Sequence, residues 1–184
     1  AAITSASIGG HTVSLTADTA ITDITFTADS ASLDIASAGA QTVTLSGGTA
    51  ASPTDVSTSS FTSGASAVSV VSAGSDALAN NQITLAGKSV ASVTVTGSEK
   101  IDVAANTSKA VATADFSGST AEEYSFSASA TEVALTFTPG AGKVTALTTG
   151  KGADSITLTD AADTVTSTGD GADTITAGAG NDTI

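Results

Sequence analysis

The sequence predicts an all-β fold, a right-handed parallel β-solenoid (β-helix) that runs into a β-roll at its C-terminal end. Three observations predict it. Pairs of apolar residues separated by one position recur about every ten residues, short segments of turn formers separate the pairs, and the chain from Thr149 onward consists of nonapeptides. The first two features are typical of short strands at steady spacing, and the third indicates stacked coils of nearly constant length.

The apolar pairs have the two-residue period of β-strands, in which alternate side chains point to the same face. In chain order they are Val13/Leu15, Ile24/Phe26, Leu33/Ile35, Val43/Leu45, Val68/Val70, Ile83/Leu85, Val93/Val95, Ile101/Val103, Tyr124/Phe126, Val133/Leu135/Phe137 and Ile156/Leu158. Turn formers lie between them, as in Ala38-Gly39-Ala40, Ser46-Gly47-Gly48, Thr96-Gly97-Ser98 and Pro139-Gly140-Ala141-Gly142. We therefore expect many short strands joined by tight turns.

An antiparallel sandwich is the other architecture that short, evenly spaced strands allow. Only 3% of the residues are aromatic, whereas a sandwich core about 10 Å thick needs more bulky side chains. Dipeptides that favour tight hairpins are scarce, and Asp170-Gly171 is the one example between predicted strands. Small side chains and regular spacing therefore favour the solenoid.

Three segments fit the strand pattern poorly. Residues 50–66 contain Pro53 and a Ser/Thr run, so we expect an irregular surface loop there. Residues 76–81 and 118–123 could each hold one short helical turn. The change of pattern at Thr149 divides the chain into a Ser/Thr/Ala-rich solenoid over residues 1–148 and a nonapeptide β-roll over 149–184.

Charge and composition exclude several classes of function. The 184 residues carry a formal net charge of −13, with five lysines and no arginine, which disfavours nucleic acids and anionic membranes as partners. No run of about 18 apolar residues is present, so we expect no membrane insertion. Cysteine is absent, and stabilisation by a bound metal would replace that of disulfides.

The nonapeptides place one aspartate at the sixth position of each repeat. These residues are Asp154, Asp163, Asp173 and Asp182, and an Ile or Val follows two residues after each of them. The pattern matches x-G-x-G-x-D-x-U-x, in which U is a large apolar residue and which is the calcium-binding repeat of the parallel β-roll. The fourth repeat stops one residue short, so we expect the chain to be a fragment of a larger protein.

The repeat spacing predicts two calcium sites on opposite edges of the roll. Because one nonapeptide is half a coil, Asp154 and Asp173 should share one edge, and Asp163 and Asp182 the other. Two stacked turns supply about six hard oxygen ligands, the number that Ca²⁺ needs. The ligands are these carboxylates together with backbone carbonyls near Gly150, Gly152, Gly169, Gly171, Gly178 and Gly180.

Two features qualify the calcium prediction. Repeat two carries Thr159 and Ala161 where the pattern has glycine, which weakens the prediction of the site on the second edge. The alternative is a metal-free solenoid in which each aspartate caps its turn. The crowding of six aspartates between Asp154 and Asp182, with no lysine after Lys151, argues against that alternative because uncompensated carboxylates would repel along the stack.

Other candidate sites are weaker. His11 is the single histidine, so neither a zinc site nor a His-based acid/base pair can be built from it alone. Aspartates also recur at regular spacing upstream, which leaves further calcium sites there as an alternative. They are Asp18, Asp23, Asp29 and Asp34. Thr-x-Thr steps indicate the polar outer face of strands or, alternatively, an ice-matching ladder.

We predict that the chain is not an enzyme, since an anionic sugar substrate would need cationic groups and aromatic platforms.

The nonapeptides resemble those of the repeats-in-toxin (RTX) family of proteins, which are exported by type I secretion. The rest of the chain, with phrases such as Ser98-Glu99-Lys100-Ile101-Asp102-Val103 and Lys109-Ala110-Val111, is similar in composition to surface-layer (S-layer) proteins of Gram-negative bacteria within that secretion class. The resemblance implies a calcium-dependent crystalline coat on the cell surface. It also implies that the export signals lie at the far C-terminus of the parent protein.

The sequence thus predicts a structural, calcium-dependent, self-assembling protein of the extracellular cell surface. We expect partners to be further copies of the chain, in a homo-oligomer or lattice, and a cell-surface polysaccharide contacted through the parent protein. Two alternatives remain: the stalk or calcium-rigidified module of a secreted RTX adhesin, and an accessory module of a polysaccharide-modifying enzyme.

Overall fold

The computed structural model describes residues 5–8, 13–15, 22–27, 33–35, 41–49, 57–63, 66–75, 80–86 and 89–184. Within these residues every regular element is a β-strand, and strands pair in parallel. The strands stack as a β-solenoid, so the prediction of an all-β parallel solenoid is confirmed. Nothing in this part of the chain forms a helix of the length and apolarity that crossing a bilayer requires.

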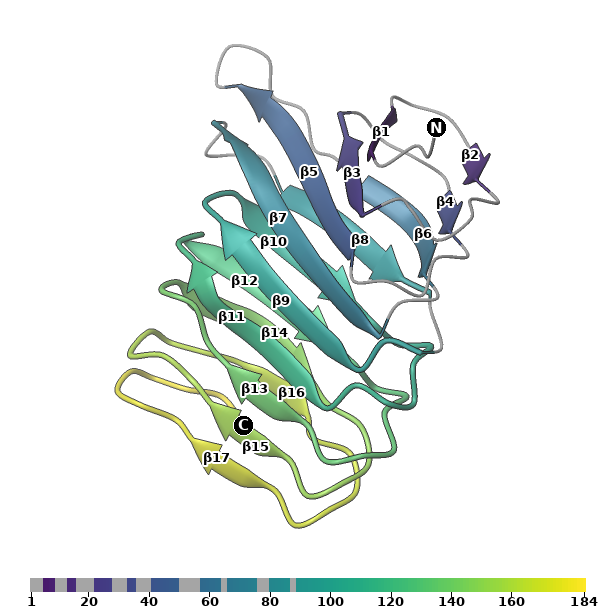
Figure 1. Cartoon of the computed structure of the whole chain (residues 1–184). Helices are drawn as coiled ribbons and strands as arrows, with labels where there is room; N and C mark the ends of the chain where they lie inside the picture. The colour runs from purple at the N-terminus through teal and green to yellow at the C-terminus, as the bar shows by residue number, and fades with distance from the viewer. Residues whose placement is uncertain are drawn as a thin grey trace.

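Successive strands alternate between two sheets, as Figure 1 shows. The odd-numbered strands form one nine-stranded sheet in the order β1 (Ser5–Ile8), β3 (Asp23–Phe26), β5 (Gln41–Thr49), β7 (Ala67–Ser75), β9 (Ser92–Gly97), β11 (Thr113–Ser119), β13 (Thr136–Thr138), β15 (Ser155–Thr157) and β17 (Thr174–Thr176). The even-numbered strands form an eight-stranded sheet, which comprises β2 (Val13–Leu15), β4 (Leu33–Ile35), β6 (Ser57–Ser63), β8 (Asn80–Leu85), β10 (Lys100–Ala104), β12 (Glu123–Ser127), β14 (Lys143–Thr148) and β16 (Val165–Ser167). Each coil therefore adds one strand to each sheet.

The core lies between the two sheets and is lined by alternate residues of each strand. In β9, Val93 and Val95 are fully buried, whereas Ser92, Thr94 and Thr96 lie on the outer face. The same alternation holds in β10 and β12 of the other sheet. A period of two thus places the apolar pairs inside and the Ser/Thr residues outside.

Both sheets continue across the change of sequence pattern at Thr149. Strand β13 pairs with β15 on one side, and β14 pairs with β16 on the other. Ile156, Leu158 and Val165 belong to the same buried cluster as the upstream core residues. The nonapeptide coils are therefore stacked directly on the Ser/Thr/Ala-rich coils.

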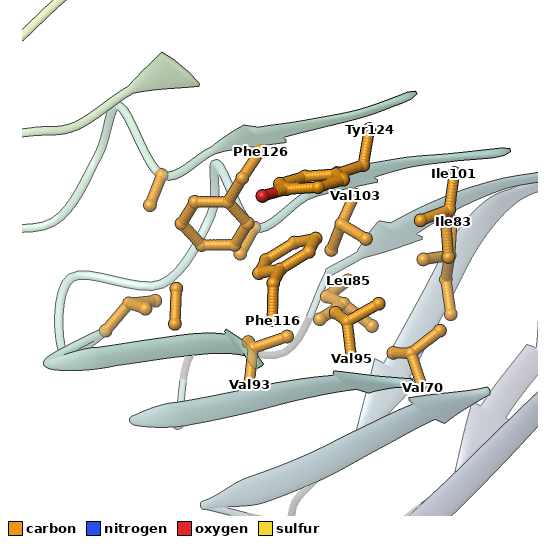
Figure 2. Packing of buried hydrophobic residues seen from close by; sticks show 14 of the residues in the cluster. Val70, Ile83, Leu85, Val93, Val95, Ile101, Val103, Phe116, Tyr124 and Phe126 are labelled. Atoms are coloured by element: carbon orange, nitrogen blue, oxygen red, sulfur yellow. The ribbon is translucent and has the colours of Figure 1, made fainter. Parts of the chain in front are cut away.

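Four aromatic rings widen the core in the middle of the stack. Phe116 of β11 is the centre of this cluster, with ring centroids 4.8 Å from Tyr124, 5.8 Å from Phe126 and 5.5 Å from Phe137. Figure 2 shows the Phe116 ring between one sheet and the Tyr124 and Phe126 side chains of the other. The cluster thus joins both sheets over neighbouring coils.

Tyr124 is buried, and its hydroxyl accepts a hydrogen bond of 2.7 Å from the Gly140 N–H. Burial raises the pKa of Tyr124 to about 12. The Gly140 hydrogen bond acts in the opposite direction, and the negative charge of Asp163 adds to the increase. Tyr124 is the only tyrosine in the sequence, so its pKa can be used to measure packing at the aromatic cluster.

Several strands form where the sequence has no apolar pair. The segment 50–66 was expected to be irregular, but its residues 57–63 form β6, which pairs with β4 and β8; residues 50–56 and 64–65 lie outside the described residues. Strands β1, β11 and β14 also lack a predicted pair. In β11 the register shifts between Asp115 and Gly118, which breaks the period of two around Phe116. Backbone pairing with existing neighbours makes these segments strands despite a poor local pattern.

The two proposed helical turns are not helical where the structure describes them. Asn80 and Asn81 begin β8, Gly118 and Ser119 end β11, and residues 120–122 form the turn before β12. Val133 is also misplaced by the prediction, since it is 41% exposed and lies before β13.

Replacing Phe116 by Ala should remove the centre of the aromatic cluster. We expect the free energy of unfolding to fall by about 3–5 kcal/mol, because the sheets cannot fully close the cavity. Urea unfolding followed by circular dichroism measures this change. The exposed Val133→Ala serves as the control and should shift the free energy by less than about 0.5 kcal/mol. Equal effects of the two variants would contradict the assigned packing.

Tyr124 should titrate at about pH 12 in the folded chain and near its ordinary value of 10.0 once the chain is unfolded in urea. Because burial raises the pKa of Tyr124 in the folded chain, this residue contributes fully to the free energy of unfolding below pH 10. Its contribution is lost as the pH rises toward 12. Ultraviolet absorbance of tyrosinate measures both titrations without interference from tryptophan, which the chain lacks. A folded-state midpoint near 10 would show that the hydroxyl is solvated.

Candidate metal centre

The nonapeptide turns lie on two edges of the solenoid. Residues 149–154 join β14 to β15, and residues 168–173 join β16 to β17, so both turns lead into the odd-numbered sheet. Residues 158–163 and 177–182 make the opposite transition, and they form the second edge. One nonapeptide is thus half a coil, which follows from the alternation of strands between the two sheets.

Asp154 and Asp173 stack on the first edge. Asp173 Oδ1 accepts a hydrogen bond of 2.9 Å from the Asp154 backbone N–H, and Asp154 Oδ1 accepts one of 2.8 Å from the Leu135 N–H. In both cases donor and acceptor are 19 residues apart. Each carboxylate therefore caps the backbone of the equivalent position in the preceding coil.

Asp163 and Asp182 repeat this arrangement on the second edge. Asp182 Oδ1 accepts a hydrogen bond of 2.9 Å from the Asp163 N–H, and Asp163 Oδ1 accepts one of 2.7 Å from the Val144 N–H. The structure thus brings together both predicted pairs. Each column ends upstream at an apolar residue, Leu135 or Val144, both of which are buried.

The second carboxylate oxygen distinguishes the two edges. Asp154 is 2% exposed, and its Oδ2 atom is buried with no hydrogen-bond partner among the described residues. Asp163 is 1% exposed, but its Oδ2 accepts hydrogen bonds from the Thr159 backbone N–H at 2.7 Å and from the Thr159 hydroxyl at 2.8 Å. A buried carboxylate oxygen without a donor is costly, so Asp154 is the exceptional group of this region.

Lys151 is the lysine closest to Asp154 in the sequence. It is exposed, and its charge contributes to the lowered pKa of Glu132, for which the Lys109 hydrogen bond and charge are the larger causes. Lys109 Nζ lies 2.7 Å from Glu132 Oε1. Since the described residues form no salt bridge with Asp154, its carboxylate is not neutralised by a lysine.

Glycines of the first edge pack directly against carbonyl oxygens of the preceding coil. A Cβ atom on Gly171, where φ is +150°, would lie 1.7 Å from the Gly152 carbonyl oxygen and 3.1 Å from Asp173 Oδ1. A Cβ on Gly169 would lie 2.0 Å from the Gly150 carbonyl oxygen. Backbone carbonyl and carboxylate oxygens therefore crowd the same turn.

The remaining predicted glycines behave alike. Gly178 and Gly180 face the carbonyl oxygens of Thr159 and Ala161 on the second edge. Asp160 is exposed, and its Oδ1 accepts a hydrogen bond of 3.0 Å from the Ala179 N–H. In the described part of the chain, no three or more His, Cys, Asp or Glu side chains gather as a metal-binding group. A cation at either edge would depend on two carboxylates and the backbone.

A polar network on the outer face of the even-numbered sheet was not predicted. Asp102 accepts hydrogen bonds from Asn80 and Ser125, and Lys100 Nζ lies 3.3 Å from Glu123 Oε2. Of these residues, Asn80, Lys100, Asp102 and Glu123 border a hollow of about 250 Å³. A spacing of 22 or 23 residues between outward positions of paired strands is the signal that could have revealed it.

Other sequence candidates contribute little. His11, Asp18 and Asp29 lie outside the described residues. Asp23 is exposed and accepts a hydrogen bond from the neighbouring Thr22 hydroxyl, and Asp34 lies within β4. No protein-family model, curated protein or solved structure matches the chain.

Replacing Gly171 by Ala should destabilise the C-terminal coils. The new methyl group would meet the Gly152 carbonyl, which belongs to the backbone and cannot move aside without shifting a coil, and φ at this position is unfavourable for an L residue. We expect a loss of about 1–3 kcal/mol or more in urea unfolding. Ala172→Ser, at the exposed neighbouring position, is the control and should be nearly neutral. A silent Gly171→Ala would contradict the close stacking of these turns.

Proposed function

We propose that this chain is a structural, non-catalytic solenoid whose C-terminal coils bind Ca²⁺ and which self-assembles at the extracellular cell surface. The buried, unpartnered Oδ2 of Asp154 carries the proposal. A buried carboxylate needs a cation or hydrogen-bond donors, and the described residues provide neither for this oxygen. A divalent cation is the partner that completes the turn.

The available ligands favour calcium. Asp154 and Asp173 would supply carboxylate oxygens, and the turns around Gly150, Gly152, Gly169 and Gly171 would supply carbonyl oxygens. Such hard oxygen ligands in an irregular loop suit Ca²⁺, whereas Mg²⁺ prefers a regular octahedron and keeps much of its water. Zinc and copper prefer His and Cys, and the described ligands include neither. When bound, the cation would neutralise the carboxylates and tie the two turns together.

The distribution of charge supports the same conclusion. Six of the 18 acidic residues lie between Asp154 and Asp182, and the chain has no lysine after Lys151. Stacking coils brings these carboxylates together and raises the electrostatic free energy of the folded state. Calcium would offset that repulsion where the chain offers no cationic side chain.

Calcium would also couple folding to location. At low cytosolic Ca²⁺ the acidic coils would remain unfolded and exportable, and millimolar Ca²⁺ outside the cell would fold them. The resemblance of the nonapeptides to RTX repeats, and of the remaining composition to S-layer proteins, supports a place in a surface lattice. The partners would be further copies of the chain and, through the parent protein, a cell-surface polysaccharide.

A structural function also fits the outer-face network. Both carboxylate oxygens of Asp102 accept hydrogen bonds from neighbouring strands, and Lys100 pairs with Glu123 across two strands. These contacts link three consecutive strands of one sheet. They account for the polar residues of the hollow as cross-strand pairs, and we assign no catalytic function to them.

Calcium should stabilise the chelator-treated chain, and Asp154→Asn should remove most of this effect. Extracellular sites bind Ca²⁺ with dissociation constants of about 10⁻⁴–10⁻³ M, so 10 mM Ca²⁺ adds about 1.4–2.7 kcal/mol per site. Urea unfolding with and without Ca²⁺ measures the gain, while light scattering follows particle size. Asp170→Asn is the matched control, because Asp170 is exposed and lies outside the repeated sixth position.

Two results would refute the proposal. The first is an unchanged urea midpoint and a persistent monomer at millimolar Ca²⁺. The second is an equal calcium response for Asp154→Asn and Asp170→Asn. This result would show that the calcium effect does not come from binding at the first edge.

A further inference from the structure

The two edges of the nonapeptide coils carry the same aspartate columns but differ in the turn before the upstream aspartate, where Thr159 and Ala161 stand in place of Gly150 and Gly152. At four positions before the aspartate, the first edge has Gly150 and the second has Thr159. Glycine offers no side-chain donor to Asp154, whereas Thr159 offers a hydroxyl in addition to its backbone N–H. The difference falls on the turn that departs from the glycine pattern.

We propose that Thr159 takes the place of a cation, so that the Asp163/Asp182 edge closes without metal and only the Asp154/Asp173 edge requires Ca²⁺. The calcium half of this inference rests on the function proposed above. The Thr159 half rests on the two hydrogen bonds, at 2.7 and 2.8 Å, that this residue donates to Asp163 Oδ2.

The carboxylate of Asp163 is fully satisfied by these contacts. Oδ1 accepts the Val144 N–H at 2.7 Å, and Oδ2 accepts both donors of Thr159. Three donors, two of them from Thr159, therefore reach the two oxygens of this buried carboxylate. A cation that bound Oδ2 would have to displace Thr159 and would leave the hydroxyl and N–H of this residue in need of new partners.

The whole turn supports this closed arrangement. The Thr159 hydroxyl, while donating to Asp163, accepts a hydrogen bond of 3.1 Å from the Ala161 N–H. Asp160 from the same turn caps the Ala179 N–H of the following coil at 3.0 Å. The contacts thus fix the turn within its own coil and against the next one. The first-edge turn has no such side chain between Gly150 and Gly152 that reaches Asp154.

The inference makes the two edges separable in calcium binding. Isothermal titration of Ca²⁺ into the chelator-treated full chain should lose one equivalent in Asp154→Asn and lose none in Asp163→Asn. Thr159→Gly removes the hydroxyl and restores glycine at one of the two departing positions, and it should gain one equivalent. Thr159→Ser keeps the hydroxyl and should retain the stoichiometry of the unmodified chain.

Stability in excess chelator tests Thr159 independently of calcium. Thr159→Val, which has nearly the same shape but no hydroxyl, should lower the urea midpoint by about 0.5 M, because a buried charged acceptor loses a donor. Thr159→Ser should recover most of that loss. Since this measurement contains no metal, it remains decisive when the titration finds no binding.

The outcomes separate the two proposals. Absence of calcium binding to the unmodified chain would overturn the calcium function together with the calcium half of the inference. Equal loss of calcium in Asp154→Asn and Asp163→Asn, or no destabilisation by Thr159→Val in chelator, would overturn the assignment of Thr159 and leave the calcium function standing.

Discussion

Parallel stacking of each coil on the preceding one is the constraint on which the rest of the structure depends. Backbone groups pair along the stack, so every residue lies next to the equivalent residue of the neighbouring coil. In the nonapeptide region this repeat is constant at 19 residues, as the four aspartate contacts show. Upstream it varies, since Ser5 pairs with Asp23, Leu33 pairs with Phe61, and 23 residues separate Asp102 from Ser125. Only the constant repeat forces identical turns to meet, and identical turns bring like charges together.

The turn that leads into the odd-numbered sheet changes its chemistry where the constant repeat begins. Upstream, Ser108 and Thr131 occupy this turn, and their hydroxyls donate to the carbonyl oxygens of Val90 and Val111 at 2.6 and 2.9 Å. The position four residues after Thr131 is the apolar Leu135. At Gly150 the hydroxyl disappears, and the position four residues later becomes Asp154. The Asp154 carboxylate, which lies in the following coil, then accepts a hydrogen bond from the Leu135 N–H. The turn thus loses a hydroxyl that donates to a backbone carbonyl and gains a buried carboxylate that accepts from a backbone N–H, and the second oxygen of this carboxylate needs a donor or a cation.

Much of the fold could be predicted from the sequence because apolar pairs at a spacing of two specify which face of a strand is buried. The pattern failed where a neighbouring strand, rather than local sequence, decides the structure. Strand β6 has a Ser/Thr run but pairs in parallel with β4 and β8, and β11 hides Phe116 within a register shift. For the candidate site, the repeat spacing gave both aspartate pairs and the departure at Thr159. It could not give the contact between Asp163 and Thr159, because that contact depends on how the turn closes around the carboxylate.

A common rule connects the two edges with the composition of the chain. With no arginine and few lysines, buried aspartates must draw on backbone amides, and one amide of the preceding coil satisfies Oδ1 at each position. The second oxygen requires one more donor or a cation. A threonine four residues earlier supplies two donors, as at Asp163, whereas a glycine supplies no side chain, as at Asp154. If calcium completes the turn at Asp154, the residue at that one position sets the metal requirement of the two buried aspartates, Asp154 and Asp163. Glycine then makes a coil dependent on the calcium of its surroundings, and threonine makes it independent.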